Sequence, residues 1–404
     1  MATQLVDLPP HVDPARVRHC ALYDRVIVHE NPYETIIPEI HQGPAVFYAD
    51  NIMFEQPGWV LRRMADIRSA YADPEHFTSA SNSGFPDLIG EAWDLIPSEL
   101  DPPYHTSVRR KIDPFFSPSR MFALEGRVRE RARGLIDKFR DRGECEFIRD
   151  FAMPFPISIF LDLVDMPQDQ LVRFYELEQD MINGTSVPQR TAALREIRAI
   201  ILAEIDRKRK NPGDDLISLS LTLEVDGKRW TDNQIFAFAF TLYLAGLDTV
   251  TSNLGLHLYH LATRGDHQAQ MRGQSAQQNV PAIEELMRAY AAVSTNRICK
   301  KEIVIAGERI MPGDFVIMAT PLASRDPEAY EDPQEIRFDR KPAHITLGFS
   351  HHRCLGRHLA RRELQIAIDE FLGAIPQFQI EPGYKTPFFL SNIIHIEELP
   401  LTWR

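Results

Sequence analysis

The sequence lacks the features that would divide the chain or export it. Its 404 residues contain no Gly/Ser-rich linker, no low-complexity tract and no internal repeat. The first residues have neither the basic start nor the apolar stretch of a secretory signal. The longest apolar run, from Ile235 to Leu247, is too short to span a bilayer and continues into Asp248. We therefore expect one large domain, 1–404, in a soluble cytoplasmic protein with no membrane partner.

Paired cysteines and an excess of positive charge are also missing. The four cysteines have no regular spacing, which argues against a disulfide framework and suits a reducing compartment. The 45 Lys and Arg residues face 57 Asp and Glu residues, giving a net charge of −12. This balance excludes a generally basic surface of the kind that binds nucleic acid. With 44% hydrophobic residues, the composition is that of an ordinary globular protein with a large core.

The segment around Cys354 is the most informative stretch that is present. Small, aromatic and basic residues occupy 344–356, and apolar residues at helical spacing follow as far as Gly373. This pattern predicts that Cys354 lies in the first turn of a helix, where unpaired amide N–H groups and the helix dipole favour a thiolate. Gly356 keeps side-chain bulk away from the sulfur. These properties suit a thiolate ligand of a large flat cofactor.

Two other interpretations of Cys354 stay open at this point. A lone cysteine at the start of a helix is most often a small buried hydrophobic residue. A zinc site is a further alternative, although structural zinc sites more often use paired cysteines at short spacing. Its ligands would be His351, His352, Cys354 and His358. Other stretches of the chain have to decide between these interpretations.

A second informative stretch is the helix expected from Asp232 to about Thr263. Its centre carries small residues, Asp248 and Thr249 where Leu or Val would stabilise a buried helix better. One interpretation is a helix weakened by glycine with one exposed polar edge. In the other, the Thr249 hydroxyl bonds to the Ala245 carbonyl and bends the helix open over a cofactor. Asp248 would then relay protons into a site closed to water.

The remaining stretches give weaker signals. A helix expected to begin at Pro281 carries Glu285 and Arg288 on one face. A strand-rich segment, 302–318, and a meander rich in Pro and Asp, 325–342, lead to the cysteine loop. The helix that carries Arg109, Arg110 and Lys111 is, taken alone, most simply a solvated basic face.

Four stretches together resemble the cytochromes P450. They are Ala-Gly-x-Asp-Thr at 245–249, Glu-x-x-Arg at 285–288, Phe-Asp-Arg at 338–340 and Cys-x-Gly at 354–356. A closer resemblance, to the bacterial camphor hydroxylase group, rests on Leu-Pro-Pro-His-Val, Gly-Glu-Ala-aromatic-Asp, and Leu-Gly-x-His-Leu-Ala-Arg-Arg-Glu after the cysteine. The resemblance covers essentially the whole chain. It implies a mainly α fold, with a large helical domain around haem and a small β-rich region, mainly 40–65, 300–320 and 375–404.

The resemblance implies a role for each motif. Cys354 would be the axial thiolate ligand of the iron in haem b, and Asp248 and Thr249 would handle oxygen and its protons. Glu285, Arg288 and Arg340 would form a structural network of ion pairs. Arg109, Arg297 and His352 would contact the anionic haem propionates. Leu347, Gly348 and Gly356 would also contact the haem. The chain departs from the family at Leu347, where an aromatic residue is usual, and at Ser350, where the loop usually has a second glycine.

The activity implied by the resemblance is that of a monomeric monooxygenase acting on a small apolar substrate. Electrons would come from a two-iron two-sulfur ferredoxin and its NAD(P)H-dependent reductase. An acidic ferredoxin would dock on basic residues, which are Arg109, Arg110, Arg353, Arg357, Arg361 and Arg362. The alternative is a sensor or structural protein that binds haem or zinc without turnover. The acid–alcohol pair favours the enzyme, because a sensor has no need of a proton relay.

The substrate is predicted from Trp93. In camphor hydroxylases the matching residue is a tyrosine whose hydroxyl holds the substrate ketone, whereas Trp has one differently placed N–H donor and a larger ring. At the position of Gly84, the camphor hydroxylase has a phenylalanine. The expected pocket residues are Phe85, Trp93, Ser98, Thr241, Leu244, Ala245, Val293, Thr295, Ile393 and Ile394. This mostly apolar set predicts a small alicyclic terpenoid or norisoprenoid, ionone-like or camphor-like, with camphor itself binding poorly.

Overall fold

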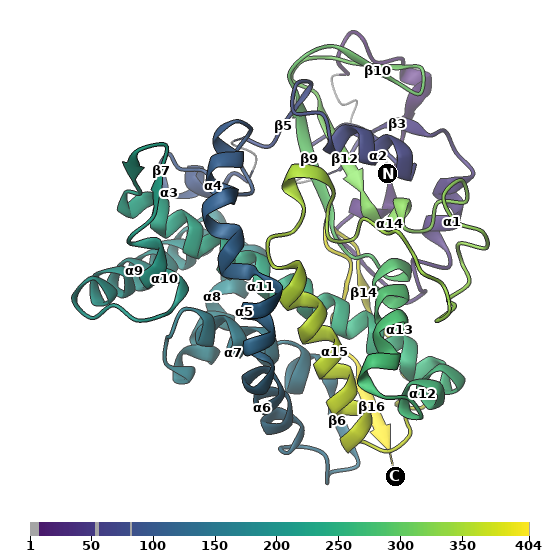
Figure 1. The fold of residues 1–404 in the computed structure, drawn as a ribbon. Coiled ribbons are helices and arrows are strands. Elements are labelled where there is room, and N and C mark those ends of the chain that lie inside the picture. The colour runs from purple at the N-terminus through teal and green to yellow at the C-terminus, as the bar shows by residue number, and fades with distance from the viewer. Residues whose placement is uncertain (1–7, 53–55, 81–82, 404) are drawn as a thin grey trace. The chain divides into compact units, whose positions relative to one another are not determined.

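The computed structural model describes residues 8–52, 56–80 and 83–403 (Figure 1). Residues 1–7, which belong to the stretch where a secretory signal was judged absent, lie outside these ranges. The chain forms two compact units. Unit 1 comprises 1–78, 255–354 and 380–399, and unit 2 comprises 79–254, 355–379 and 400–404. Each unit is therefore assembled from segments far apart in the sequence.

The main sheet of unit 1 has six strands in the order β1-β3-β4-β12-β9-β5. β3 and β4 pair antiparallel, with Tyr48 opposite Trp59. In chain order the strands are β1 (Val17–Arg18), β3 (Val46–Ala49), β4 (Gly58–Leu61), β5 (Phe77–Thr78), β9 (Ser294–Cys299) and β12 (Phe315–Ala319). β9 lies outside the expected β-rich ranges.

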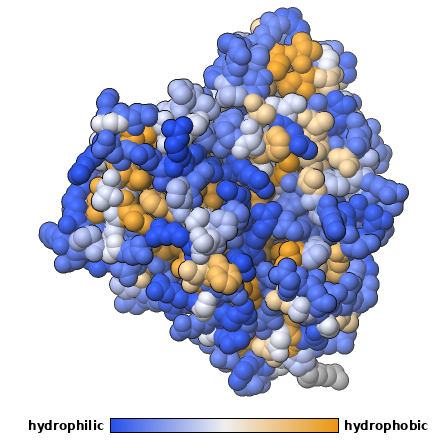
Figure 2. All heavy atoms as spheres, in the orientation of Figure 1, coloured by the Kyte–Doolittle hydropathy of each residue, from blue (hydrophilic) through white to orange (hydrophobic). Residues whose placement is uncertain are grey.

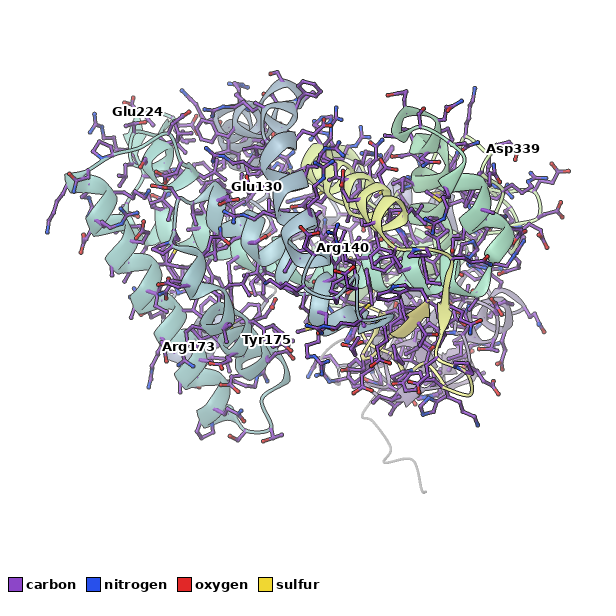
Figure 3. The ribbon with its side chains drawn as sticks, turned by 90° about the horizontal axis from the view of Figure 1, so that it is seen from below. Glu130, Arg140, Arg173, Tyr175, Glu224 and Asp339 are labelled. Carbon is purple, nitrogen blue, oxygen red and sulfur yellow. The ribbon has the colours of Figure 1, made fainter. Side chains whose placement is uncertain are left out.

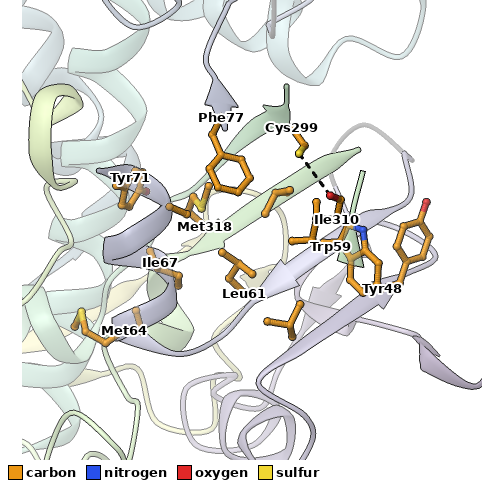
Figure 4. Packing of buried hydrophobic residues seen from close by; sticks show 14 of the residues in the cluster. Tyr48, Trp59, Leu61, Met64, Ile67, Tyr71, Phe77, Cys299, Ile310 and Met318 are labelled. Atoms are coloured by element: carbon orange, nitrogen blue, oxygen red, sulfur yellow. Dashed lines mark hydrogen bonds between the residues drawn. The ribbon is translucent and has the colours of Figure 1, made fainter. Parts of the chain in front are cut away.

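Helix α2 (Met64–Tyr71) packs on this sheet. Its apolar residues Met64, Ile67 and Tyr71 recur at helical spacing and enter a buried cluster with strand residues (Figure 4). Burial of such side chains stabilises the fold by roughly 1.5–3 kcal/mol each. Cys299 belongs to the same cluster, and its thiol donates to the Ile310 carbonyl over 3.8 Å (Figure 4). This cysteine is a buried hydrophobic residue.

Unit 1 contains further helices and strands. The helices are α1 (Ile36–His41), α12 (Gly265–Arg272), α13 (Ala276–Ala289) and α14 (Thr320–Ala323). The strands are β2 (Ile27–Val28), β10 (Ile303–Ile305), β11 (Glu308–Ile310), β14 (Phe388–Phe389) and β15 (His395–Ile396). The prediction that α13 begins at Pro281 was wrong, because Ser275 and Gln278 form a capping box that starts the helix at Ala276 and leaves Pro281 inside it.

Unit 2 is mainly helical. Its helices are α3 (Phe85–Ile89), α4 (Tyr104–Ile112), α5 (Pro118–Ala123), α6 (Glu125–Ile136), α7 (Pro154–Leu163), α8 (Leu171–Asn183), α9 (Val187–Lys210), α10 (Leu216–Ser220), most of α11 (Asp232–Thr263) and α15 (Arg357–Ala374). Helix α15 runs beside α6 (Figure 1). The strands are β6 (Glu144–Glu146), β7 (Glu224–Val225), β8 (Lys228–Arg229), β13 (Phe378–Ile380) and β16 (Pro400–Trp403). The helix-rich fold with a smaller β part confirms the predicted fold class.

Helix α11 has the predicted bounds, Asp232–Thr263. In the described part of the chain it is the one helix long and apolar enough to cross a bilayer, by length and composition only. Of its most apolar window, 61% is buried inside the protein, as is usual for a core helix. On the face drawn in Figure 2, hydrophilic residues predominate and hydrophobic residues form small separate patches.

Candidate active site

The loop that carries Cys354 folds closely back on itself. The Cys354 N–H donates to the Leu347 carbonyl over 2.8 Å, and the cysteine is half-buried. Gly348 has φ +72°, and a Cβ there would lie 3.2 Å from the His352 carbonyl oxygen. Glycine at this position therefore allows the loop to turn around the cysteine.

The predicted place of Cys354 in a helix was wrong. Helix α15 begins at Arg357, with Gly356 as its N-cap, so the cysteine lies three residues before the helix. The reason is the turn formed by Leu355 and Gly356. Because the Cys354 N–H is bonded inside the loop, it is not one of the unpaired amides of a helix N-terminus.

Ser350 adopts a backbone conformation that favours glycine. Its φ is +57°, and it begins the 3-10 helix η6 (Ser350–His352). The left-handed region costs a residue with a Cβ about 1–2 kcal/mol. The departure from the family pattern at Ser350 therefore places a side chain on a strained turn, next to the loop that holds the cysteine.

A buried ion network supports the meander that leads to this loop. Arg288 donates to both oxygens of Glu285 over 2.8 and 2.9 Å, and Arg340 donates to the same carboxylate over 3.1 Å. Glu285 and Arg288 are both 0% exposed. The structure thus brings together the three residues expected to form ion pairs. Arg288 also donates to the carbonyls of Ser324, Pro333 and Glu335.

The loop is also fixed directly to α13. The imidazole of His344 contacts Glu284 over 3.1 Å, and the Thr346 hydroxyl donates to the Met287 carbonyl over 3.0 Å. Both contacts come just before Cys354 in the chain. The same helix therefore positions the meander and the cysteine loop.

The residues expected at the haem propionates differ in their surroundings. In unit 1, Arg297 on β9 is 8% exposed, lies over the Tyr71 ring and donates to the Asn296 carbonyl. His352 is half-buried in η6. In unit 2, Arg109 on α4 is 9% exposed and donates to Asp113 over 2.6 Å. The solvated basic face therefore consists of Arg110 and Lys111, which are exposed, and excludes Arg109.

The acid–alcohol pair lies on α11 in unit 2. The Thr249 hydroxyl donates to the Ala245 carbonyl over 2.9 Å, as expected from the sequence. Ser252 and Asn253 make matching bonds to the carbonyls of Asp248 and Thr249, over 2.6 and 2.7 Å. The Asp248 carboxyl has a side-chain hydrogen bond with Glu178 of α8. α11 stays helical through this stretch, so these bonds are additions to the helix and do not break it.

Sequence reasoning missed Glu178. It is 3% exposed, and burial, followed by the nearby Asp248 charge, raises the pKa of Glu178 well above its ordinary value. The available signal was a carboxylate in the apolar stripe of α8, between Phe174 and Met181. Its partner is 70 positions away in the chain, so pairing depends on how α8 packs.

The expected pocket residues of unit 2 gather around α11. Trp93 makes edge contacts with Phe236 at 5.1 Å and Phe240 at 5.5 Å between ring centroids, and Phe85 contacts Phe240 at 5.6 Å. Phe236 and Phe240 are one helical turn apart and were missed. They stand on the same helix as Thr241, Leu244 and Ala245. Together these side chains form a largely aromatic wall.

Several polar groups of this wall are already bonded within the protein. The Trp93 N–H donates to Glu91 over 3.1 Å, and the Thr241 hydroxyl donates to the Ala237 carbonyl over 2.7 Å. Ser98 is exposed and its hydroxyl donates to the Leu95 carbonyl over 3.4 Å. The N–H donor that the sequence assigned to Trp93 is therefore engaged by Glu91.

The remaining pocket residues gather in unit 1. Val293 pairs with Ile393 in an isolated antiparallel bridge, and the Ile394 N–H donates to the Ala292 carbonyl over 3.0 Å. The Thr295 hydroxyl is hydrogen-bonded to the Tyr71 hydroxyl over 2.7 Å. This second set is also apolar, and its polar member has a partner.

A surface groove of unit 1 lies beside the cysteine loop. It has a volume of about 680 Å³ and is lined by Arg63, Met64, Ala65, Arg68, Ser69, Ala72, Asp326, Glu328, Ala329 and Phe349. The Arg68 guanidinium lies 4.5 Å from the centre of the Phe349 ring. Arg68 and Ser69 are exposed. Sequence reasoning did not single out Arg63 or Arg68.

The donor set of the loop fits a haem and does not fit a zinc ion. Among residues 8–52, 56–80 and 83–403, no three His, Cys, Asp or Glu side chains gather to hold a metal, so the zinc set of four does not form. One thiolate suffices for iron only when a cofactor such as porphyrin supplies the other ligands. A Cβ at Gly356 would meet no atom within 4 Å, which leaves space beside the loop for such a group.

The loop geometry predicts opposite effects for two substitutions. Ser350→Gly should leave the free energy of unfolding unchanged or raise it by up to about 1 kcal/mol, because relief of strain offsets the added freedom of the unfolded chain. Gly348→Ala should lower it by about 1–2 kcal/mol, because the alanine is strained and its Cβ meets the His352 carbonyl. Urea unfolding of both variants measures this. Equal destabilisation by the two changes would contradict the assigned conformations.

Comparisons with known proteins identify the family of this chain. A family model described as "Cytochrome P450" matches residues 188–384. "Probable cytochrome P450 127A1" of Sinorhizobium fredii (strain NBRC 101917 / NGR234) is 33% identical over 98% of this chain and 97% of its own. The crystal structure of cytochrome P450 CYP101C1 has 30% identity and a TM-score of 0.86, covering 98% of this chain and 100% of that one. CYP101J2 has 27% identity and a TM-score of 0.88, covering 99% and 100%. The chain therefore belongs to the cytochrome P450 family of haem-thiolate monooxygenases, which bind haem b.

Proposed function

We propose that this monooxygenase hydroxylates a small alicyclic terpenoid or norisoprenoid, such as an ionone-like ketone, with electrons from a ferredoxin. The observation that carries the substrate proposal is the aromatic wall formed by Trp93, Phe236 and Phe240, whose polar group is already bonded to Glu91. A soluble cytoplasmic monomer is the form in which we expect it to work. The charge of −12 supports the absence of a nucleic-acid partner.

The haem-binding residues follow from the loop and its surroundings. Bound haem activates dioxygen so that one atom enters a C–H bond while the other leaves as water, with two electrons and two protons. Cys354 would hold the iron, and Gly348 and Gly356 would keep bulk away from the ring plane. Leu347 accepts the Cys354 N–H and so orients the loop. Arg109, Arg297 and His352 would hold the anionic propionates.

Proton handling would belong to Thr249 and Asp248. The Thr249 hydroxyl donates to the Ala245 carbonyl, and its oxygen can still accept a hydrogen bond from another group. Asp248 is the next residue along the helix and has a carboxyl partner in Glu178. A hydroxyl beside an acid can pass protons into a site from which water is excluded.

Thr249→Ala should uncouple the enzyme. We expect substrate affinity to stay the same, while product formed per NADH consumed falls roughly tenfold or more and hydrogen peroxide is released instead. The measurement compares NADH consumption, product and peroxide in the reconstituted enzyme. Thr251→Ala is the matched control, because the Thr251 hydroxyl is on the same helix but donates to the Ala152 carbonyl. Full coupling in Thr249→Ala would remove the proposed role.

The substrate class follows from the lack of spare polar anchors. The hydroxyls of Thr241 and Thr295 have partners within their own units, and the Trp93 N–H is engaged. A substrate that meets these side chains is held mainly by shape and burial of apolar surface. A rigid bicyclic ketone such as camphor, which gains from one directed hydrogen bond, is therefore disfavoured relative to larger apolar rings.

An optical titration of the ferric enzyme tests this proposal. Ionones should produce a near-complete shift to high spin at micromolar concentration, and camphor only a small one. Trp93→Ala should weaken ionone binding roughly tenfold or more, because it removes a large apolar surface. Trp93→Phe is the control that removes the N–H but keeps a ring, and it should change binding much less. A full shift with camphor and none with ionones would overturn the substrate proposal.

We propose that an acidic ferredoxin delivers electrons through exposed basic residues, and the expected set of these residues is revised. Arg109 and Arg362 do not serve as surface charges, because Arg109 is buried against Asp113 and Arg362 pairs with Glu125 over 3.1 Å. Arg110 and Arg353 are exposed, and Arg357 and Arg361 are half-buried. Arg68 adds a positive charge at the groove beside Phe349, five positions before the cysteine. These charges suit an acidic ferredoxin.

Charge reversal tests the docking proposal. Arg68→Glu and Arg110→Glu should each slow reduction by an acidic ferredoxin several-fold at low ionic strength, and the difference from the unmodified enzyme should shrink as salt screens the charges. Arg309→Glu is the control, because Arg309 is on β11 with Glu302 and does not line the groove. Reduction rates that depend neither on salt nor on these two reversals would contradict a basic docking surface.

A further inference from the structure

Glu178 is a carboxyl group on the buried side of α8. Its neighbours in the apolar stripe, Phe174, Leu177 and Met181, are each at most 1% exposed, and Glu178 itself is 3% exposed. The opposite side of the helix is polar: Arg173 lies toward the outside of unit 2 (Figure 3) and pairs with Glu196 of α9. Glu178 therefore stands where an apolar residue would stabilise the packing better.

The partner of Glu178 is another acid. Its side chain is hydrogen-bonded to Asp248 of α11, and within the described residues its Oε1 atom has no hydrogen-bond partner. Two ionised carboxylates accept hydrogen bonds and cannot donate them. A hydrogen bond between the two side chains consequently requires one proton on the pair.

Three polar groups on the helices around α8 have partners other than Glu178. On α7, Asp162 binds Arg131 of α6 over 2.8 Å, and on α9, Arg190 donates to the Met181 carbonyl over 3.1 Å. On α11, the Tyr243 hydroxyl donates to the Phe174 carbonyl over 2.6 Å. None of these three groups supplies a cation to Glu178. The hydrogen bond between the two carboxyl groups is therefore the observation that calls for a proton on the pair.

We propose that Glu178 is a positioning residue that shares one proton with Asp248. This shared proton keeps Asp248 supplied with a proton that it can donate toward Thr249. The inference rests on the proposed role of Asp248 and deepens it. In the transfer, the O–H bond of Glu178 breaks as an O–H bond forms on Asp248, which can then donate toward Thr249. Glu178 is left as a carboxylate, and a proton from solvent water restores it. No electron changes hands in this step.

Burial and the neighbouring negative charge act in the same direction on Glu178. Both raise its pKa well above the ordinary value, which favours keeping a proton on the pair. A carboxyl group exposed to water loses its proton at lower pH. The pair thus extends the pH range over which an acid is available next to Thr249.

Infrared spectroscopy of the ferric haem-loaded enzyme tests the shared proton directly. At neutral pH the protein should show the carbonyl stretch of a protonated carboxylic acid, with a small shift in D2O. Glu178→Gln should abolish this band, and Asp248→Asn should shift it because the hydrogen-bond partner changes. Glu176→Gln, an exposed acid two residues away, should leave it unchanged. A band unaffected by Glu178→Gln would overturn the proposal.

A second buried acid serves as an internal control. Burial raises the pKa of Glu363 on α15 to about 8, so it adds its own protonated-acid band. Glu363→Gln should remove only that band. If Glu363→Gln removes all protonated-acid absorption from the otherwise unmodified enzyme, Glu178 is ionised and the proposal is wrong.

The pH profile of coupled turnover separates this inference from the proposed function. In Glu178→Gln, the alkaline fall in product per NADH should move down by roughly one pH unit or more. Asp248→Asn should lose coupling at every pH. If Asp248→Asn stays coupled, the relay itself is wrong, whatever the infrared result. If only Glu178→Gln leaves the profile and the band unchanged, the relay stands and the shared proton is refuted.

Discussion

The buried ion pair between Glu285 and Arg288 is the interaction on which the cysteine loop depends. Both side chains are 0% exposed, and removing two ions from water costs several kcal/mol for each. The cost is offset because Glu285 accepts hydrogen bonds from Arg288, Arg340 and the Arg337 N–H, while Arg288 also donates to three carbonyls of the following segment. The network therefore ties α13 to the meander whose end is the cysteine loop. Loss of one partner would leave a buried charge and release that segment.

Local features of this site could be predicted from the sequence. The bounds of α11 follow from its long apolar stretch, and the Thr249 bond to Ala245 connects residues one helical turn apart. Features that depend on competing local signals were missed. Pro281 is typical of a first helical turn, but the capping box at Ser275 starts α13 earlier, and the Leu355-Gly356 turn delays α15 beyond Cys354.

Features that depend on packing could not be predicted. Arg362 was expected among the basic docking residues, yet it pairs with Glu125, which is 237 positions away in the chain. Arg109 was expected there too, but it is buried. The aromatic wall needs Trp93 to meet Phe236 and Phe240, which only the arrangement around α11 decides. Composition identified an apolar pocket, but it did not show that Glu91 engages the Trp93 N–H.

Helix α11 combines hydrogen bonds that stabilise it with one carboxyl group, Asp248, whose partner is a second acid. Its polar side chains at 241, 249, 252 and 253 each donate to the carbonyl four residues earlier, so the helix supplies an acceptor for these donors. Asp248 cannot be satisfied in this way, because an ionised carboxylate needs a donor or a positive charge. A lysine or arginine would supply a fixed charge that holds the carboxylate ionised. A second acid supplies a proton instead, and a proton can leave, which makes the carboxyl pair suited to delivery where an ion pair would only stabilise.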